Sequence, residues 1–256
     1  MNRSILDLYV EGSASTINKS TIKALKDRNL LNDNNSLSEL GKRYAISKMS
    51  LQHQCSELSL ELKVVDLEYT GKPEHALLEH FKTLGYIGSS QEGAGILTVL
   101  KALMLDKLAE YNIFNDRSDA CSRYLEAQLS SLKDRAYEII SSITVTSEER
   151  FKHNFRQILT QPFVASEYPG LSLEFGMSMY HAIDTKVYVA LAKLIVSDPY
   201  TYRSGWPDLT LIKGNSVLFV EVKTTDKLHD SQIATISAVR DILPYNFMIY
   251  KVRKAL

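Results

Sequence analysis

The segment RSGWPDLTLIKGNSVLFVEVKTTD, residues 203–226, predicts a β-hairpin and decides the fold that we expect. Two β-rich runs, 208–212 and 217–223, flank Gly214-Asn215, and a Gly-Asn pair favours a tight hairpin turn. Such a turn fixes the register of an antiparallel pair. The facing residues are then Ile212 with Val217, Thr210 with Phe219 and Asp208 with Glu221.

The facing carboxylates of Asp208 and Glu221 are unusual in a hairpin. Directly opposed side chains have Cβ atoms about 4.5–5.5 Å apart, and like charges at that distance are destabilising unless something neutralises them. A divalent cation is a natural neutraliser. Lys223 lies two residues after Glu221 and therefore projects to the same face of the strand. We expect this face to carry chemistry and the opposite face to be core, filled by Leu218, Val220 and Val222.

Carboxylate oxygens without His or Cys are the ligands that Mg²⁺ and Mn²⁺ prefer, which argues against zinc. A cation held in this way polarises a phosphoryl oxygen and lowers the pKa of a bound water. Lys223 can hold or activate that water, or stabilise the developing charge. The three residues therefore predict phosphodiester hydrolysis. The alternative is a Pro-Asp turn followed by an amphipathic strand whose charged side chains are simply solvated.

Composition restricts the class of protein. The chain has 256 residues, 45% of them hydrophobic, which suffices for one large domain or two modest ones. Its formal net charge is zero, so contact with nucleic acid must come from local basic patches, here within residues 19–48 and 203–254. Cys55 and Cys121 fit no zinc spacing, and we expect free thiols. No run of about eighteen apolar residues occurs, so we expect a cytoplasmic protein without a membrane segment.

The spacing of apolar residues divides the chain into three expected parts. Residues 1–72 predict short helices, and residues 73–200 predict further helices, one of them continuous over 119–140. Residues 201–256 predict the hairpin, a helix and a third strand at 247–252. The expected fold class is α/β, with a helical amino-terminal region followed by a compact β-β-α-β core.

The first part contains two helix-like pieces, Ser20–Leu30 and Leu37–Ser47, joined by a polar turn. This order is compatible with a helix-turn-helix or winged-helix-like module that contacts DNA. Two ordinary amphipathic helices are the alternative, because such pairs occur in most helical domains.

The hairpin and the helix after it resemble the VRR-NUC domain, the virus-type replication-repair nuclease branch of the PD-(D/E)XK superfamily. That pattern runs Arg-x-Gly-x-Pro-Asp-Leu, then Val-Glu-Val-Lys, then Asp-x-Leu and a Gln on the next helix. The matching residues are Arg203, Gly205, Pro207, Asp208, Leu209, Val220, Glu221, Val222, Lys223, Asp226, Leu228 and Gln232. The resemblance implies a restriction-endonuclease-like core with nuclease activity.

The superfamily also uses an acidic residue on a preceding helix, and the candidates are Glu92, Glu126 and Glu174. The stretch QEGAGILTVLKALMLDKL is similar to the Gly-Glu-Gly helix of the Fanconi-associated nuclease group, and DACSRYLEAQ, which follows, also resembles that group. We therefore favour Glu92, although Gln91 stands where the group usually has Gly.

By resemblance, Asp208, Glu221, the carbonyl of Val222 and Glu92 hold Mg²⁺ or Mn²⁺. Lys223 is then the catalytic lysine. The remaining implied roles belong to Gln232, which orients Lys223 or a phosphate, and to Arg203 and Lys227, which flank the scissile phosphate. Ordinary surface charge is the alternative for the last two. Trp206 stacks on a base or caps the hairpin core, and we favour the core.

We expect a metal-dependent DNA nuclease, endo- or exonucleolytic, in replication or repair. Resemblance to the Fanconi-associated nucleases implies branched or flapped DNA, with single-stranded arms, as the substrate. A defence or interbacterial toxin nuclease with the same chemistry, and with an immunity protein as partner, is one alternative. A DNA-binding or adaptor module without catalysis is the other.

Overall fold

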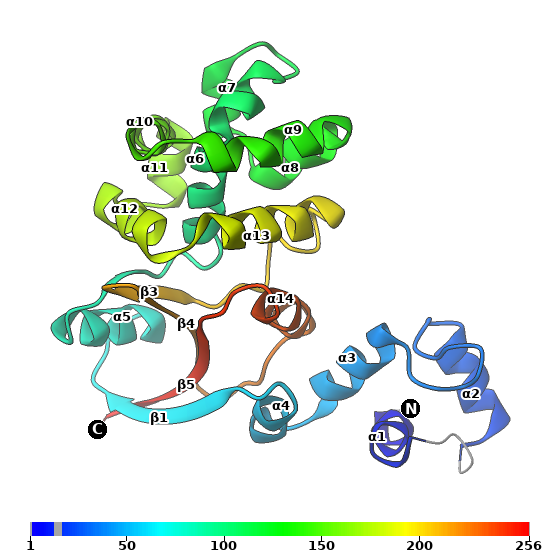
Figure 1. The fold of residues 1–256 in the computed structure, drawn as a ribbon. Coiled ribbons are helices and arrows are strands. Elements are labelled where there is room, and N and C mark those ends of the chain that lie inside the picture. Colours follow the sequence, from blue (N-terminus) through cyan, green and yellow to red (C-terminus); the bar gives the residue numbers. More distant parts are fainter. Residues whose placement is uncertain (1, 13–16, 256) are drawn as a thin grey trace.

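The computed structural model describes residues 2–12 and 17–255, which form a helical region, a five-stranded sheet and a set of amino-terminal helices (Figure 1). The strands are β1 (Glu61–Leu67), β2 (Ile87–Ser89), β3 (Leu209–Lys213), β4 (Ser216–Lys223) and β5 (Asn246–Lys254). The α-helices are α1 (Asn2–Glu11), α2 (Lys19–Lys26), α3 (Glu39–Lys48), α4 (Leu51–Glu57), α5 (Pro73–Thr83), α6 (Ala94–Glu110), α7 (Arg117–Ser122), α8 (Leu125–Ser131), α9 (Ala136–Ser141), α10 (Glu148–Leu159), α11 (Pro162–Glu167), α12 (Leu173–Ala182), α13 (Thr185–Ser197) and α14 (Asp230–Arg240). Short 3₁₀ helices cover Lys133–Arg135 and Ser142–Val145.

The sheet has the strand order β1-β5-β4-β3-β2. Neighbours from β2 to β4 run antiparallel, whereas β4 with β5 and β5 with β1 run parallel. A parallel pair needs a crossover connection, and α14 supplies it between β4 and β5. The sequence of β3, β4, α14 and β5 is the β-β-α-β core that the sequence predicts, so the expected α/β fold class is confirmed.

The register of the hairpin agrees with the prediction. Ile212 lies opposite Val217 and Thr210 opposite Phe219 across the β3–β4 pair. Gly214 occupies the turn with a φ of +58°, a left-handed conformation that glycine adopts without steric cost. Asp208 precedes the first residue of β3, so it reaches toward β4 from just outside the ladder.

Both faces of the sheet are covered. Leu218, Val220 and Val222 fill a core face as expected, and the face that carries Glu221 and Lys223 is buried as well, which the sequence did not predict. Helix α5 packs Leu77, Leu78 and Phe81 against the face that carries Val220. On the other face Phe219 stacks on Phe247 in the larger core, with ring centroids 4.8 Å apart. Figure 1 shows α5 and α14 on opposite sides of β4 and β5. The charged residues at the end of β4 are therefore buried rather than solvated.

The helical region is organised around α6, whose residues are mostly buried on every side. The helix predicted over 119–140 is not continuous: it is divided into α7, α8, a 3₁₀ turn and α9. A buried lysine of α6 stabilises the first of these breaks. The Lys101 ammonium donates to the carbonyls of Cys121 and Arg123, at 2.7 Å for Arg123, and so satisfies carbonyls at the end of α7.

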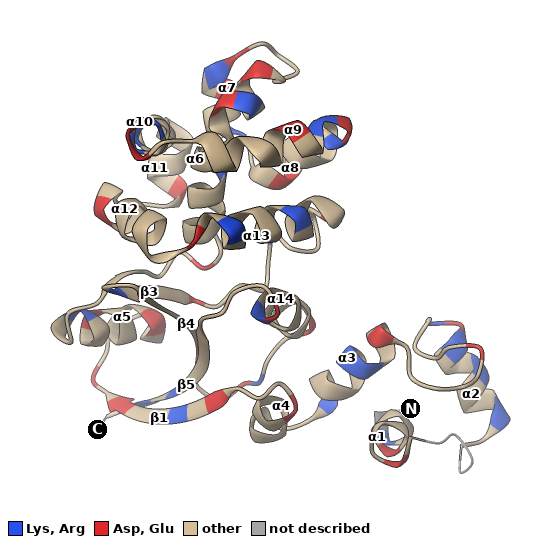
Figure 2. Ribbon diagram, in the orientation of Figure 1, with Lys and Arg blue, Asp and Glu red and all other residues tan. Residues whose placement is uncertain are grey.

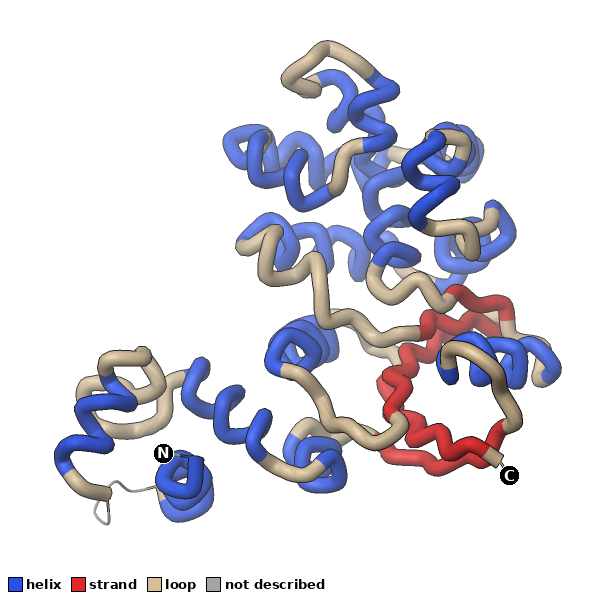
Figure 3. Tube along the Cα trace, turned by 180° about the vertical axis from the view of Figure 1, so that it is seen from behind, coloured by secondary structure: helices blue, strands red, loops and turns tan. Residues whose placement is uncertain are grey.

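The amino-terminal helices α1 to α3 share a small core of their own, built from Ile5, Leu8, Leu25, Leu30, Leu31 and Ala45. They stand to one side of the sheet, while the strands gather at one end of the helical region (Figure 3). Each of the three expected parts contributes at least one strand to the sheet, and the division at residues 72 and 200 stays a prediction. Met1 and Leu256, the outer ends of that division, lie outside the described residues.

Two further expectations concern the cysteines and the absence of a membrane segment. Cys55 and Cys121 are buried free thiols. Within residues 2–12 and 17–255, no helix is both long and apolar enough to cross a membrane. A cytoplasmic location stays a prediction.

Gly205 is expected to be irreplaceable for steric reasons. A Cβ atom at this residue would lie 2.2 Å from the carbonyl oxygen of Ser231, at the start of α14, and the backbone has a φ of +79°. Gly214 has a similar φ but open space around it. We predict that Gly205→Ala lowers the free energy of unfolding by at least about 3 kcal/mol and Gly214→Ala by about 1–2 kcal/mol, measured by urea denaturation. Equal losses in the two variants would contradict this account.

Candidate active site

Asp208, Glu221 and Lys223 meet at the end of the hairpin away from its turn. Glu221 and Lys223 lie on the same side of β4, and the Lys223 Nζ atom is 2.8 Å from Glu221 Oε1. Asp208 Oδ2 accepts a hydrogen bond of 2.8 Å from the backbone amide of Val222. Only 1% of Glu221 and 4% of Lys223 are exposed. The hairpin thus brings together the three residues predicted from its register.

The Glu221 carboxylate is in an environment that disfavours its negative charge. Burial, followed by the nearby Asp208 carboxylate, raises its pKa to about 8 in spite of Lys223. One oxygen, Oε2, is buried and has no hydrogen-bond partner among the described residues. An unpaired buried carboxylate oxygen is costly, and a cation is a partner that would both pair it and relieve the repulsion.

The donor set fits Mg²⁺ or Mn²⁺. Carboxylates and a backbone carbonyl are hard oxygen ligands, and Mg²⁺ commonly uses one or two carboxylates while keeping several waters. In the described part of the chain, no three His, Cys, Asp or Glu side chains converge closely enough to form a preassembled metal cluster.

Gln232, in the first turn of α14, connects the two charged residues of β4. Its Oε1 atom accepts from Lys223 Nζ at 3.1 Å, and its Nε2 atom donates to Glu221 Oε1. The backbone amide of His229 also donates to Gln232 Oε1, which holds the side chain in place. Burial acts to lower the pKa of Lys223, but Glu221, Asp226 and Asp208 outweigh it and the pKa is raised. Lys223 is therefore a cation at neutral pH.

Glu92 reaches the site from a distant part of the sequence. It lies in the turn before α6, with a φ of +46°, and not on the helix as expected. Its Oε1 atom accepts a hydrogen bond of 3.3 Å from the amide of Gly205. Burial, and then the Asp208 carboxylate, raise the pKa of Glu92. The carboxyl is thus near enough to Asp208 for the two to repel each other.

The other two carboxylate candidates are placed differently. Glu126 is buried on α8, and its Oε1 atom is 3.6 Å from Arg203 Nη1. Glu174 is exposed on α12. Glu92 is the candidate that lies at the hairpin, since it accepts from the Gly205 amide and the Asp208 carboxylate raises its pKa.

The residues expected to flank a phosphate are only partly oriented for that purpose. Arg203 is half exposed and pairs with Glu126 beside the site. Lys227 points away, since its Nζ atom donates to the carbonyl of Met49 at 3.2 Å and links the strand-to-helix loop to the amino-terminal helices. Trp206 is 1% exposed and donates to the carbonyl of Tyr202, so it belongs to the core as expected.

Two further acidic residues lie near the site: Glu74, which the sequence analysis did not single out, and Asp226, which it named only as part of the family pattern. Glu74 on α5 raises the pKa of Asp208, after the larger effect of burial. Asp226 lies 3.6 Å from Lys223 Nζ. The helical spacing of Glu74, Leu77, Leu78 and Phe81 is a signal that places Glu74 on the sheet-facing side of α5.

Comparison with known proteins supports the resemblance. Residues 141–254 match the family model described as the VRR-NUC domain. Two similar solved structures are crystal structures of paFAN1, one bound to 2nt 5′ flap DNA with gap and one to 1nt 5′ flap DNA with gap. Both are 18% identical to this chain, with TM-scores of 0.56 and 0.58. They cover 100% and 99% of this chain, which spans 49% of each paFAN1 chain. No curated protein matches.

The raised carboxyl pKa values predict how stability depends on pH. Glu221 has an ordinary pKa of 4.5 and a folded pKa of about 8, so the folded state holds a proton that the unfolded state has lost between these values. The contribution of Glu221 to stability is then fully present below about pH 4.5 and falls as the pH rises toward 8, by on the order of 1 kcal/mol per pH unit. Thermal unfolding in EDTA from pH 5 to pH 9 measures this slope.

The matched variants are Glu221→Gln and, on the exposed side of α12, Glu174→Gln. We predict a smaller slope in Glu221→Gln and an unchanged slope in Glu174→Gln. Adding Mg²⁺ or Mn²⁺ at pH 8 should raise the melting temperature of the wild type and of Glu174→Gln but not of Glu221→Gln. A wild-type protein without any response to either cation would contradict the proposed donor set.

Proposed function

We propose that this protein, whose residues 141–254 match the VRR-NUC domain model, hydrolyses the phosphodiester bonds of DNA at Asp208, Glu221 and Lys223, with Mg²⁺ or Mn²⁺ as cofactor. The observation that carries the proposal is the unpartnered Oε2 atom of Glu221, buried beside a second carboxylate and a lysine. A structural ion pair would need no such unpaired oxygen.

Asp208, Glu221 and the carbonyl of Val222 are the proposed ligands of the cation, and Glu92 joins them directly or through water. A bound divalent cation supplies polarisation of a phosphoryl oxygen and a water of lowered pKa. The hydrogen bond from the Val222 amide to Asp208 Oδ2 holds that carboxylate at the end of β4. The amide of Gly205 does the same for Glu92.

Lys223 is proposed to stabilise negative charge that develops on the phosphate and the attacking oxygen. Its raised pKa keeps it protonated at neutral pH, which makes it a donor and not a general base. Glu221 and Gln232 hold its ammonium from two sides. A preorganised cation in a site with little water costs no reorganisation during the reaction.

Branched or flapped DNA is the proposed substrate, as in the paFAN1 complexes, and the proposed setting is replication or repair. Formal charge is balanced over the whole chain, so attraction for the phosphate backbone must be local. Lys and Arg residues gather on α2 and α3 (Figure 2), and α3 packs near α14, which borders the site. These helices are proposed to contact the DNA backbone beside the cleaved strand.

Nuclease assays on flap, splayed-arm and linear DNA test the proposal. We predict metal-dependent cutting that falls at least about a hundredfold in Asp208→Ala, Glu221→Ala and Lys223→Ala, because each removes a group that acts on the transition state. The control is Lys213→Ala, an exposed lysine at the turn end of the same hairpin. If the three variants cut as fast as the wild type, the site is elsewhere. If the wild type cuts nothing but binds DNA, the binding-module alternative gains.

The role of Glu92 has its own test. We predict that Glu92→Gln lowers the cleavage rate at least about tenfold while Glu174→Gln has no effect, because only the first is close to Asp208. Glu92→Gln keeps an oxygen that can accept from the Gly205 amide, so a folding defect is not expected. Loss of activity in Glu174→Gln alone would transfer the role to α12.

A further inference from the structure

Gln54 is a polar side chain, 0% exposed, that connects α4 to the segment between β4 and α14. Its Nε2 atom donates to the carbonyls of Ile46 and Leu228, at 3.1 and 3.2 Å, and its Oε1 atom accepts from the Leu228 amide at 2.8 Å. A buried amide is costly unless it is hydrogen-bonded. Gln54 meets this requirement by binding both backbone groups of a residue 174 positions away.

Leu228 lies where the chain has no regular structure of its own. Residues 224–229 connect the end of β4 to the start of α14 and belong to neither a strand nor a helix. The backbone groups of such a segment need partners from elsewhere. Gln54 supplies them from α4, which lies between α3 and the sheet (Figure 1). Lys227 adds a second link through the carbonyl of Met49, between α3 and α4.

The peptide bond between Leu228 and His229 relays this contact to the active site. Its carbonyl oxygen accepts from Gln54, and its N–H group donates to Gln232 Oε1 at 3.0 Å. The same Oε1 atom accepts from Lys223 Nζ at 3.1 Å. A peptide unit is planar, so a hydrogen bond to its carbonyl restricts the direction in which its N–H group points. A continuous chain of hydrogen bonds therefore joins Gln54 to Lys223.

The direction of the His229 amide matters because the side chain of Gln232 has two chemically different ends. Its Oε1 atom faces the Lys223 ammonium and its Nε2 atom faces the Glu221 carboxylate. Rotation of the side-chain amide by half a turn would place a donor against the ammonium and an acceptor against the carboxylate. A backbone N–H group that points at Oε1 disfavours this rotation, since it would then meet Nε2. The orientation of the 228–229 peptide thus selects the form of Gln232 that holds Lys223.

We propose that Gln54 is a positioning residue of the nuclease site, which fixes the 228–229 peptide and, through it, the side-chain amide of Gln232 beside Lys223. The inference rests on the proposed function and deepens it, because it gives α4 a part in the reaction. The proposed role of Lys223 is to stabilise charge that develops in the transition state. Loss of the Gln54 amide is therefore expected to slow the chemical step and to leave DNA binding unchanged.

Steady-state cleavage of flap DNA in Mg²⁺ tests the inference. Gln54→Met keeps a similar side-chain volume and removes all three hydrogen bonds. We expect kcat to fall about tenfold, with KM unchanged within about twofold. The matched control is Gln128→Met, because Gln128 is a buried glutamine of α8 that donates to the carbonyls of Ala120 and Arg123. This control should lose a comparable amount of stability in thermal unfolding and keep the kcat of the wild type.

A double-variant cycle separates positioning from a general loss of stability. If Gln54 acts through Gln232, the variant that carries both Gln54→Met and Gln232→Met has the kcat of Gln232→Met alone. Independent effects would multiply instead. All assays are run below the melting temperature of the least stable variant. Gln54→Leu, whose smaller side chain fits the same space, takes the place of Gln54→Met if that variant does not fold.

The outcomes distinguish the two proposals. A lower kcat in the Gln54 variant, together with a cycle in which the effects do not multiply, supports the inference. A folded variant with the kcat of the wild type, a change in KM alone, or effects that multiply in the cycle overturns the role of Gln54 and leaves the nuclease proposal intact. A wild type that cuts no DNA overturns both.

Discussion

The repulsion between two buried carboxylates is the constraint on which the site depends. Glu221 is almost fully enclosed, it faces the charge of Asp208, and its pKa is raised as a result. Lys223 compensates one oxygen of Glu221, and Gln232 donates to the same oxygen, whereas the second oxygen is left unpaired. Such an arrangement costs stability in the absence of a cation and is therefore evidence of function.

The rest of the fold maintains this arrangement by close packing. The sheet is enclosed between α5 and the larger core, so the charged end of β4 is shielded from water. Gly205 allows the start of α14 to approach the strand entry, and this approach carries Gln232 to Lys223. Gly93 allows the turn before α6 to pack on the ring of Trp206, where a Cβ atom would come within 2.4 Å. These contacts bring Glu92 to the hairpin.

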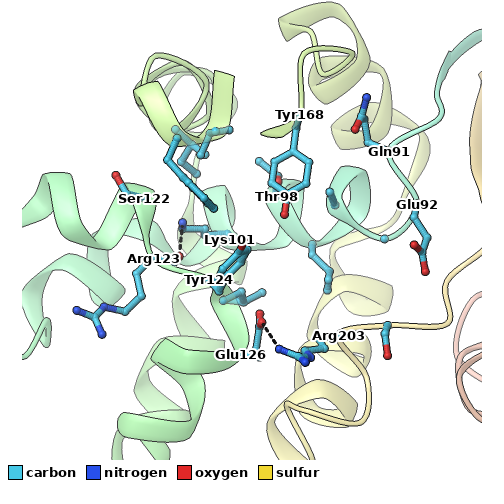
Figure 4. A pocket seen from close by; sticks show the side chains of 18 residues that line it. Gln91, Glu92, Thr98, Lys101, Ser122, Arg123, Tyr124, Glu126, Tyr168 and Arg203 are labelled. Atoms are coloured by element: carbon cyan, nitrogen blue, oxygen red, sulfur yellow. Dashed lines mark hydrogen bonds and ion pairs between the residues drawn. The ribbon is translucent and has the colours of Figure 1, made fainter. Parts of the chain in front are cut away.

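The helical region also shapes the surroundings of Glu92. The break between α7 and α8, which Lys101 stabilises through two carbonyls, leaves Tyr124 at the start of α8, where it lines a pocket that Glu92 also lines (Figure 4). A continuous helix over the same residues would leave no such opening. The break thus helps to set where aromatic and charged groups lie beside Glu92.

Local pattern was sufficient to predict the hairpin, its register and the shared face of Glu221 and Lys223. A turn dipeptide and the alternation of side chains act over a few residues, and no other part of the chain is needed to satisfy them. The VRR-NUC resemblance was visible in the same short stretch. Resemblance ranked Glu92 above Glu126 and Glu174, but it could not place any of these carboxylates in space. Glu92 accepts from the Gly205 amide, and the two residues are 113 positions apart in the sequence. Only the tertiary structure decided the approach of Glu92 to Gly205, the burial of both sheet faces and the contact of Lys227 with Met49. Contacts of that kind depend on how whole elements fit together, and side-chain periodicity within one element carries no information about it.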